Sequence, residues 1–310
     1  NRALRHLLIA AFLLLQIGFT VYEYQHINTT ELTYFTADSL AMLLLMVLSI
    51  ISIPAFYHSY VYLGTKQDNP KHTAIYFGAM TALLTSISAA YLSNHIAVTW
   101  IFVELTTLSA SALIYHRRNN RSLEGTWKYV FVCAISITLV FIGILFLSFS
   151  LPKAGTEDLS FANLLKKSSE LNVFWLRLAF IFIFTGLTAK LGLVPMYTAG
   201  IDAKDKAPSP AGALLSSVLM NVGFVGIFRT YIIIANSPVH QWASHVIIIA
   251  ALLSIFVATV YMTRVKNIKR MFAYSSIEHA GLIMLGLAAG GVGYYAAVLH
   301  IPVLDRKSVV

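Results

Sequence analysis

Residues 173–199 read VFWLRLAFIFIFTGLTAKLGLVPMYTA, a stretch long and apolar enough to cross a bilayer as a helix, which takes about 20 residues. Backbone groups inside lipid must find hydrogen-bond partners within the chain, so a helix is the form expected here. Two residues do not suit an uninterrupted span: Lys190 carries a charge far from either end, and Pro195 removes a helical hydrogen bond. The stretch therefore predicts a transmembrane helix that breaks near Pro195 and Gly192.

The whole chain has the composition of a membrane protein. Of its 310 residues, 58% are hydrophobic and only 11% are charged, against about 25% charged residues in an average soluble domain. The single cysteine, Cys133, excludes a disulfide and any iron–sulfur cluster built by this chain alone. We predict an all-α, polytopic membrane helix bundle with nine complete transmembrane helices. They cover residues 4–22, 37–57, 73–92, 96–115, 126–149, 173–199, 209–234, 242–262 and 271–289, and a tenth begins near residue 291.

The basic residues between the spans predict the orientation of the chain. Thirteen lysines and arginines fall on the side of the N-terminus, and three, Lys153, Lys166 and Lys167, fall on the other side. Because basic loops stay in the cytoplasm, we expect a cytoplasmic N-terminus in a bacterial inner membrane. The net charge of +9 comes largely from these basic loop residues, so we do not expect nucleic acid as a partner. The longest external loop is expected to contain a short amphipathic helix near residues 161–165.

Charged residues at membrane depth are the candidate functional residues. Glu104 lies near the middle of the fourth span, Lys190 in the sixth, Glu278 and His279 in the ninth, and Lys128 near the cytoplasmic start of the fifth. A charge at the bilayer centre costs at least about 2.5–3.5 kcal/mol, so each requires a partner or a function. Two interpretations of Glu104 and Lys190 stay open: a structural ion pair, or a relay that exchanges protons. Lys128 can also extend to the cytoplasmic surface.

Other polar residues of the spans have simpler interpretations. Arg177 and Arg229 lie near outer helix ends, where we expect them to pair structurally or to reach the headgroups. Asn221 is the central polar group of the seventh span, available to hydrogen-bond across helices or to hold water. The break near Pro195 is either a simple kink or an opening that lets Lys190 meet water.

Three motifs carry a resemblance to a known family. They are GLTAKLGLVPM at 186–196, APSPAGALLS at 207–216 and NIKRMFAYSSIEHAG at 267–281. Together they resemble the proton-conducting, antiporter-like membrane subunits of complex I, Mrp-type antiporters and membrane-bound hydrogenases. The last motif and RSLEGTWKY at 121–129 look most like the hydrogenase-4 membrane component branch. The resemblance implies about fourteen helices, so we expect this chain to be part of a longer protein.

The family also implies a division of the chain and roles for its residues. Residues 1–310 would form one transmembrane domain, with N-terminal helices in 1–72, a first five-helix repeat in 73–235 and an incomplete, inverted second repeat in 240–310. Glu104, Lys128 and Lys190 match the glutamate of the family's fifth helix, the lysine of its sixth and the lysine of its broken seventh.

The chain departs from the family at several positions. Asn221 stands where several members have a lysine, Lys204 replaces a loop histidine, and Tyr197 begins the segment that replaces a His-x-Trp motif. The inverted repeat makes Glu278, with His279, the positional counterpart of Glu104. We therefore expect a relay of Glu104, Lys190, Lys128, Asn221, Glu278 and His279.

The expected function is proton translocation in a hydrogenase-4 or complex I-like respiratory assembly, coupled to redox chemistry in partner subunits. An Mrp-type cation/proton antiporter subunit, which would also move sodium, is the main alternative. A proton-coupled subunit of inorganic-carbon uptake and a structural scaffold are further alternatives. The expected partners are other membrane and peripheral subunits, the lipid bilayer and protons. We assign the chain no catalytic site and no cofactor of its own, because it contains no iron–sulfur ligand set and no dinucleotide-binding motif.

Overall fold

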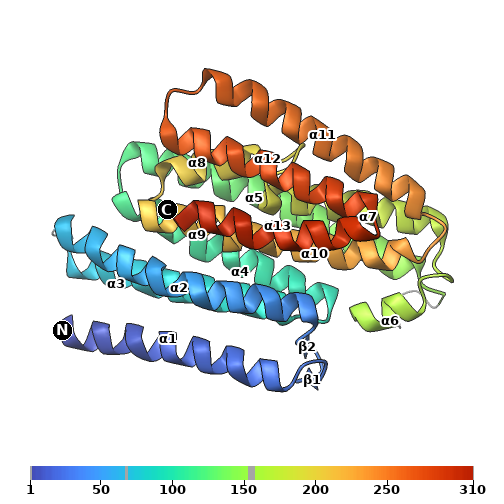
Figure 1. Cartoon of the computed structure of the whole chain (residues 1–310), viewed down its shortest axis with the longest axis horizontal. Helices are drawn as coiled ribbons and strands as arrows, with labels where there is room; N and C mark the ends of the chain where they lie inside the picture. Colours follow the sequence, from blue (N-terminus) through green and yellow to red (C-terminus); the bar gives the residue numbers. More distant parts are fainter. Residues whose placement is uncertain (1, 67–68, 153–157, 310) are drawn as a thin grey trace.

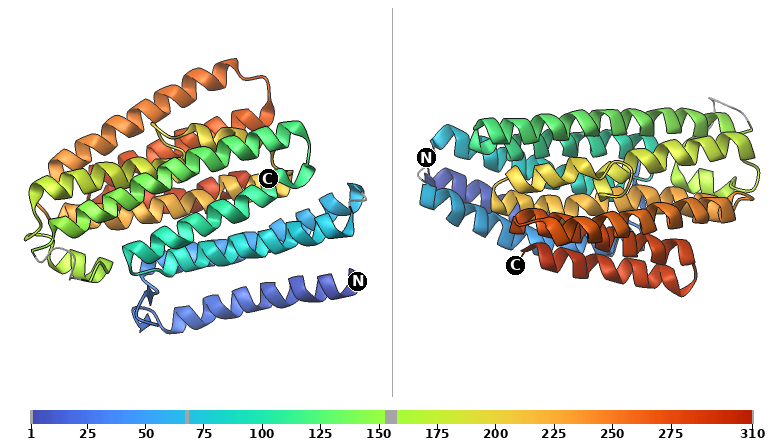
Figure 2. Two further views of the ribbon diagram at one scale, coloured as in Figure 1. Left: turned by 180° about the vertical axis from the view of Figure 1, so that it is seen from behind. Right: turned by 90° about the horizontal axis from the view of Figure 1, so that it is seen from above.

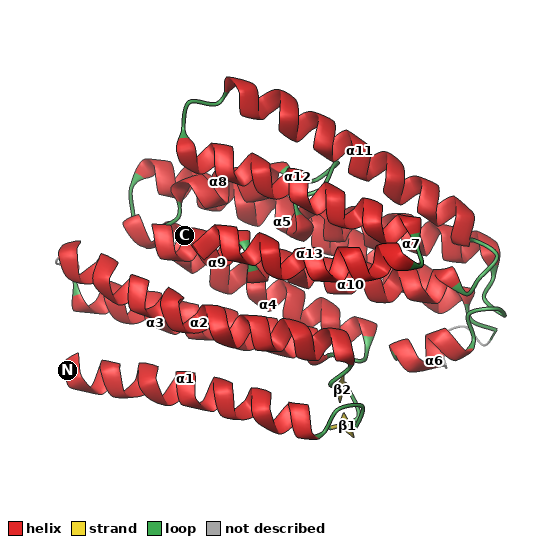
Figure 3. Ribbon diagram, in the orientation of Figure 1, coloured by secondary structure: helices red, strands yellow, loops and turns green. Residues whose placement is uncertain are grey.

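The computed structural model describes residues 2–66, 69–152 and 158–309 as a bundle of long helices (Figures 1 and 3). The first half contains α1 (Arg2–Gln25), β1 (Thr30–Glu31), β2 (Phe35–Thr36), α2 (Ser39–Lys66), α3 (Pro70–Leu92), α4 (Ile96–Ile114), α5 (Asn120–Ser150) and α6 (Phe161–Lys166). The second half contains α7 (Val173–Leu191), α8 (Thr198–Lys206), α9 (Ser209–Ser216), α10 (Val218–Ala235), α11 (His240–Arg264), α12 (Ile268–Ala289) and α13 (Val292–Val309).

The all-α membrane architecture is confirmed. Within the described residues, nine helices or helix pairs are long and apolar enough to cross a membrane, and each coincides with one of the nine predicted stretches. The short helix predicted near residues 161–165 is present as α6. The hairpin of β1 and β2, which the sequence analysis did not predict, pairs Thr30 with Thr36 and Glu31 with Phe35.

Two predicted spans end early or are divided in the structure. The sixth, predicted to reach residue 199, ends at Leu191, because Gly192 adopts a left-handed conformation with φ of 84° and its N–H donates to Thr188 O. The helix break near Pro195 is therefore confirmed, but the span is shorter than predicted. The seventh, predicted as one helix, is divided into α9 and α10 at Ser217, whose φ and ψ are −109° and −100°.

The helices form a bundle with a buried centre and apolar edges. Figure 1 places α1 at one edge and α11 at the other, and Figure 2 shows α5 and α13 on opposite sides of the bundle when it is seen from above. Most of α10 is buried, whereas Leu14 and Leu15 of α1 and Phe256 of α11 are exposed. This pattern fits a bundle surrounded by lipid, because a lipid-facing surface has no need of polar side chains.

One end of the bundle is fixed by a buried arginine. Arg229 of α10 donates to the backbone oxygens of Ser93 and Tyr91 and forms an ion pair of 2.9 Å with Asp38. These contacts join α10 to the start of α2 and the end of α3. Arg177 lies with its guanidinium carbon 5.5 Å from the ring centroid of Trp242. Both arginines therefore have structural partners.

Candidate functional site

The break after α7 places a lysine in a buried polar centre. Lys190 lies in the last turn of α7 and is only 7% exposed. Its Nζ donates to Thr107 Oγ1 at 2.7 Å, to Thr106 Oγ1 at 3.2 Å and to Tyr129 OH at 3.4 Å. An ammonium group has three N–H donors, so three hydroxyl groups satisfy it without a carboxylate. We call Thr106, Thr107 and Tyr129 the hydroxyl cradle.

The two threonines of the hydroxyl cradle present oxygen lone pairs to the lysine. The hydroxyl hydrogen of Thr106 is donated to Val103 O at 2.6 Å, and that of Thr107 to the same oxygen at 3.4 Å. Their lone pairs remain for an outside donor. The Tyr129 ring adds to the environment of the charge, since Nζ of Lys190 lies 5.6 Å from its centroid. The cradle thus favours a positively charged group.

Glu104 lies near this centre but does not contact the lysine. It precedes the two threonines on α4 and is half-buried. Its charge acts on Lys190 and Tyr129, yet no ion pair within 4.0 Å joins Glu104 and Lys190 in the described part of the chain. The buried Oε2 of Glu104 has no hydrogen-bond partner there. The glutamate and the lysine are therefore neighbours that this conformation keeps apart.

Two small cavities meet Lys190 from different sides. One, of about 20 Å³, is lined by Lys190, Tyr129 and Lys204 together with residues of α9 and α10. The other, of about 10 Å³, lies between α4, α5 and α7 and is lined by Cys133, Ser136 and Lys190 among others. About 10–15 Å³ is enough for one water molecule. Lys190 thus lines two spaces of about the size of a water molecule.

Lys204, a second lysine at this centre, was not among the predicted site residues. It lies on α8 and is 8% exposed, and its Nζ contacts Met220 Sδ at 3.1 Å. Burial lowers the pKa of Lys204 from 10.5 to about 7. The sequence showed only that a lysine replaces a histidine there. Its depth depends on how α8 packs against α10, which local sequence does not determine.

A close helix contact brings α10 against the broken end of α7. A Cβ atom at Gly223 would lie 3.0 Å from Lys190 Cβ and 2.6 Å from the Leu191 backbone nitrogen, so a larger residue does not fit. Asn221, a predicted relay residue, is buried on α10 beside Met220, which lines the larger cavity. Helix α10 therefore contributes the close approach to Lys190 and carries a buried amide next to Met220 in the chain.

Comparison with known proteins identifies the family. Residues 93–303 match the family described as NADH:quinone oxidoreductase/Mrp antiporter, TM. The chain belongs to this family. It is 30% identical over 276 residues to the hydrogenase-4 component F homolog of Methylacidiphilum infernorum, covering 86% of this chain and 58% of that protein. It is 29% identical over 269 residues to NADH-quinone oxidoreductase subunit N of Neisseria gonorrhoeae, covering 86% and 54%. The chain thus spans about half the length of these relatives.

Two solved structures have the same fold as this chain. The chain superposes with a TM-score of 0.86 and 22% identity on a subunit of the membrane-bound sulfane sulfur reductase, an archaeal respiratory membrane complex, covering 97% of this chain and 63% of that one. It superposes with a TM-score of 0.81 and 16% identity on a chain of the Mrp complex from Dietzia sp., covering 99% and 58%. The family match and the candidate spans together make the chain a multi-pass, antiporter-like membrane subunit.

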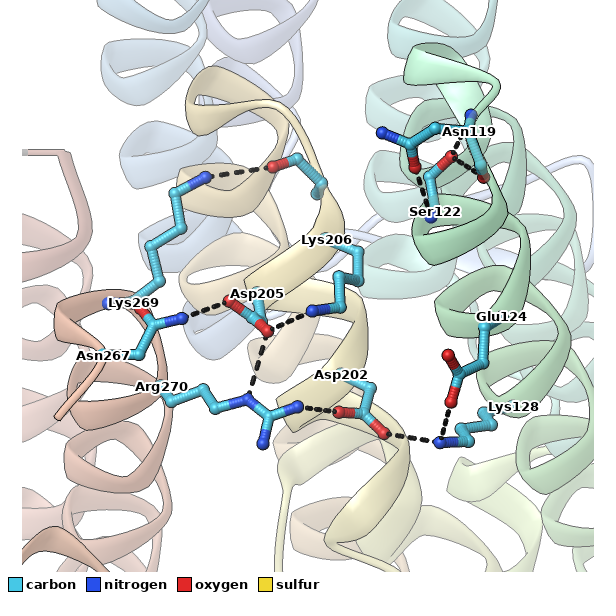
Figure 4. A network of polar contacts seen from close by, with 11 residues as sticks. Asn119, Ser122, Glu124, Lys128, Asp202, Asp205, Lys206, Asn267, Lys269 and Arg270 are labelled. Atoms are coloured by element: carbon cyan, nitrogen blue, oxygen red, sulfur yellow. Dashed lines mark hydrogen bonds and ion pairs between the residues drawn. The ribbon is translucent and has the colours of Figure 1, made fainter. Parts of the chain in front are cut away.

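Lys128 lies apart from the hydroxyl cradle. Its side chain is 55% exposed and contacts Glu124 at 2.6 Å and Asp202 at 3.8 Å, in the network drawn in Figure 4. The next residue, Tyr129, faces Lys190 instead. The lysine that matches the family's sixth helix thus belongs to a network at the end of the bundle.

Glu278 and His279 lie on α12, at a second position. Nδ1 of His279 is 3.1 Å from Nε2 of His300, a residue of α13 that the sequence analysis did not select. Glu278 is half-buried on the same helix. His279 and His300 belong to α12 and α13, and the hydroxyl cradle belongs to α4 and α5, among the residues that the structure describes. Among the same residues, no group of three or more His, Cys, Asp or Glu side chains is arranged to hold a metal ion.

Proposed function

We propose that this chain is a proton-translocating membrane subunit of a hydrogenase-4 or complex I-like respiratory assembly, whose partner subunits supply the redox chemistry. The observation that supports this most strongly is the position of Lys190, a buried ammonium at a helix break with a small cavity on each side. A lysine that served only to pack or to pair would not require space for water on two sides. The names of the relatives fit such an assembly.

In this mechanism Lys190 carries the proton and Glu104 is its counter-charge. The hydroxyl cradle holds the ammonium in one position, and Glu104, whose Oε2 has no hydrogen-bond partner in the described residues, provides a second. Movement of Nζ between the two changes which cavity the ammonium faces. The proton then leaves on a different side from the one on which it arrived, which is what directional transport requires.

Lys204 supplies protons to Lys190 across the larger cavity. A pKa of about 7 lets Lys204 take up and release protons near neutral pH, and water in the cavity can connect the two amines. Lys128 gathers protons at the surface network, and Asn221 holds water near Met220. Glu278 and His279 perform a corresponding step in the second repeat.

The remaining expectations about this chain are part of the same proposal. Residues 73–235 form the first repeat and 240–310 the start of the inverted second repeat. The N-terminus is cytoplasmic and the membrane is a bacterial inner membrane. The thirteen basic residues on one side, against three on the other, support this orientation.

Proton flux in proteoliposomes that contain the full assembly tests the proposal. We expect Lys190→Ala to abolish redox-coupled flux, and Lys266→Ala, which changes an exposed lysine in the loop after α11, to leave flux unchanged. Assembly of both variants is checked by purification of the intact complex. Normal coupled flux in assembled Lys190→Ala complexes would remove Lys190 from the mechanism.

An Mrp-type antiporter subunit is the second candidate function, favoured by the structural likeness to a chain of the Mrp complex. The same lysines would then exchange protons for sodium without a redox partner. Flux that needs a sodium gradient but no electron donor would support this candidate, whereas flux that needs the electron donor and ignores sodium would support the respiratory assembly.

A further inference from the structure

Helix α8 presents two faces with different chemistry. Ile201, Ala203 and Lys204 are buried, and Lys204 lines the cavity that it shares with Lys190. Asp202 and Asp205, three residues apart and therefore on one side of the helix, point toward α12 (Figure 4). Any force that moves the aspartates also moves Lys204, because nine residues of helix form one rigid piece.

The start of α12 holds the aspartate face at several points. Arg270 donates from Nη2 to Asp202 at 2.8 Å and from Nε to Asp205 at 3.1 Å. Asn267 donates to the other oxygen of Asp205 at 2.9 Å, and Lys269 donates to Ala207 O at 3.2 Å. One planar guanidinium thus bridges two carboxylates on successive positions of the α8 face, a geometry that lysine cannot reproduce.

The environment of Asp205 makes these contacts stronger than surface ion pairs. Its side chain is only 5% exposed. Burial alone would raise the pKa of Asp205, but the hydrogen bonds from Lys206 and Arg270 outweigh it and lower the pKa. The carboxylate therefore remains charged at neutral pH and depends on its donors, so loss of Arg270 leaves a buried charge with fewer partners.

We propose that Arg270 is a positioning residue that fixes α8 against α12 and thereby keeps Lys204 buried beside Lys190. Its effect on proton flux rests on the proposed function, but its effect on the burial of Lys204 does not. Since α12 also carries Glu278 and His279, the same contact joins the two proposed half-channels. Movement of α12 would change the access of water to the lysines of the first repeat.

Titratable and charged groups surround α8 on both faces. On the cavity side they are Lys190 and Tyr129. On the other side they are Glu124, Lys128, Tyr197, Asp202, Asp205, Lys206, Lys269, Arg270 and Tyr274.

The test measures the accessibility of Lys204 directly. The full chain in its membrane assembly is treated briefly with an amine-acylating reagent near pH 8, and labelling of each lysine is quantified by peptide mass spectrometry. In Arg270→Gln we expect the labelling rate of Lys204 to rise at least about tenfold, the factor by which loss of only one of the two charge-assisted hydrogen bonds would shift a local equilibrium. Lys166, exposed in the external loop, provides the reference rate, and Lys266→Gln is the matched control variant.

Two further variants separate positioning from a general loss of folding. Asp205→Asn keeps the shape of the contact but weakens it, and we expect a smaller rise in Lys204 labelling. Arg270→Lys keeps the positive charge but cannot bridge both carboxylates, and we expect labelling to return part of the way from the Arg270→Gln rate toward the original rate. A merely structural defect would raise the labelling of lysines throughout the chain and would not be rescued.

Flux measurements on the same preparations complete the test. If Lys204 loses its burial in Arg270→Gln, the pH above which proton flux stops should rise. A solvated lysine keeps its proton to higher pH than a buried one. Unchanged Lys204 labelling in an assembled Arg270→Gln protein would overturn the inference. If labelling rises while Lys190→Ala still pumps protons, the positioning role stands and the proposed function fails.

Discussion

Replacement of Lys204 by methionine tests the consequences of burying an amine. Its pKa is about 7 in the folded protein and 10.5 as the ordinary value, which the unfolded chain adopts. At 1.36 kcal/mol for each pH unit between these values, burial of the charged form costs about 5 kcal/mol at most. Methionine has a similar length and suits a position beside Met220, so Lys204→Met removes this cost with little change in packing.

The sign of the pH dependence follows from proton binding. Below about pH 7 the lysine is charged in both states, so the whole cost applies and Lys204→Met is the more stable protein. Between about pH 7 and 10.5 the unfolded chain binds more protons than the folded one, so the stability of the original protein rises with pH. The advantage of Lys204→Met therefore shrinks across this window and disappears above it.

Unfolding in detergent at about pH 6 and about pH 9.5 measures this difference. We expect a higher unfolding midpoint for Lys204→Met at the lower pH and a smaller gap at the higher pH. Lys266→Met, in an exposed loop, should show no such pH dependence. A gap that is equal at both pH values, or a destabilised Lys204→Met at the lower pH, would refute the reasoning that burial controls this amine.

Three other predictions concern the packing around the site. Thr107→Val should destabilise the protein by about 2 kcal/mol, because it leaves an N–H donor of Lys190 without an acceptor. Thr107→Ser keeps the hydroxyl group and should have little effect. Thermal unfolding of the two variants checks this prediction. Gly223→Leu should cost about 1–3 kcal/mol or prevent assembly, measured by unfolding and by yield of the complex, since no space exists beside Lys190. Arg229→Met should cost about 3 kcal/mol in the same unfolding assay, because two buried carbonyl oxygens and Asp38 lose their donor.

The membrane fold was predictable because its signals are local. A run of about 20 apolar residues has few other uses, and the nine predicted stretches all correspond to candidate spans of the structure. The helix break was predictable for the same reason, since proline and glycine act on the backbone of their own segment. The position of the break was less predictable, because the helix ends at Gly192 and not at Pro195.

The break at Ser217 left no comparable signal. Serine is tolerated inside transmembrane helices, and the small residues of that span also fit close helix packing. Only the arrangement of α9 and α10 around the lysines distinguishes a divided helix from a continuous one.

The contacts of the site depend on tertiary structure and were predicted less well. The sequence selected Glu104 and Lys190 by charge, but not the threonines that hold the lysine, because threonine in a helix commonly bonds to its own backbone. The sequence left open whether Lys128 reaches the surface, since the rotation of a helix within the bundle decides whether a residue near its end meets solvent. Lys204 required the packing of α8 to be known.

The termination of α7 at Leu191 has an electrostatic consequence for Lys190. In an unbroken span the lysine would lie in mid-helix, where the peptide dipoles of neighbouring turns cancel. In the last turn it lies at the negative end of the helix macrodipole, which stabilises a cation by about 0.3–1 kcal/mol and by up to about 2 kcal/mol where water is excluded. The helix dipole, unlike a charged side chain, neither titrates nor changes position relative to Lys190. It provides a constant background field that favours the charged form of Lys190 in the position where the hydroxyl cradle holds it.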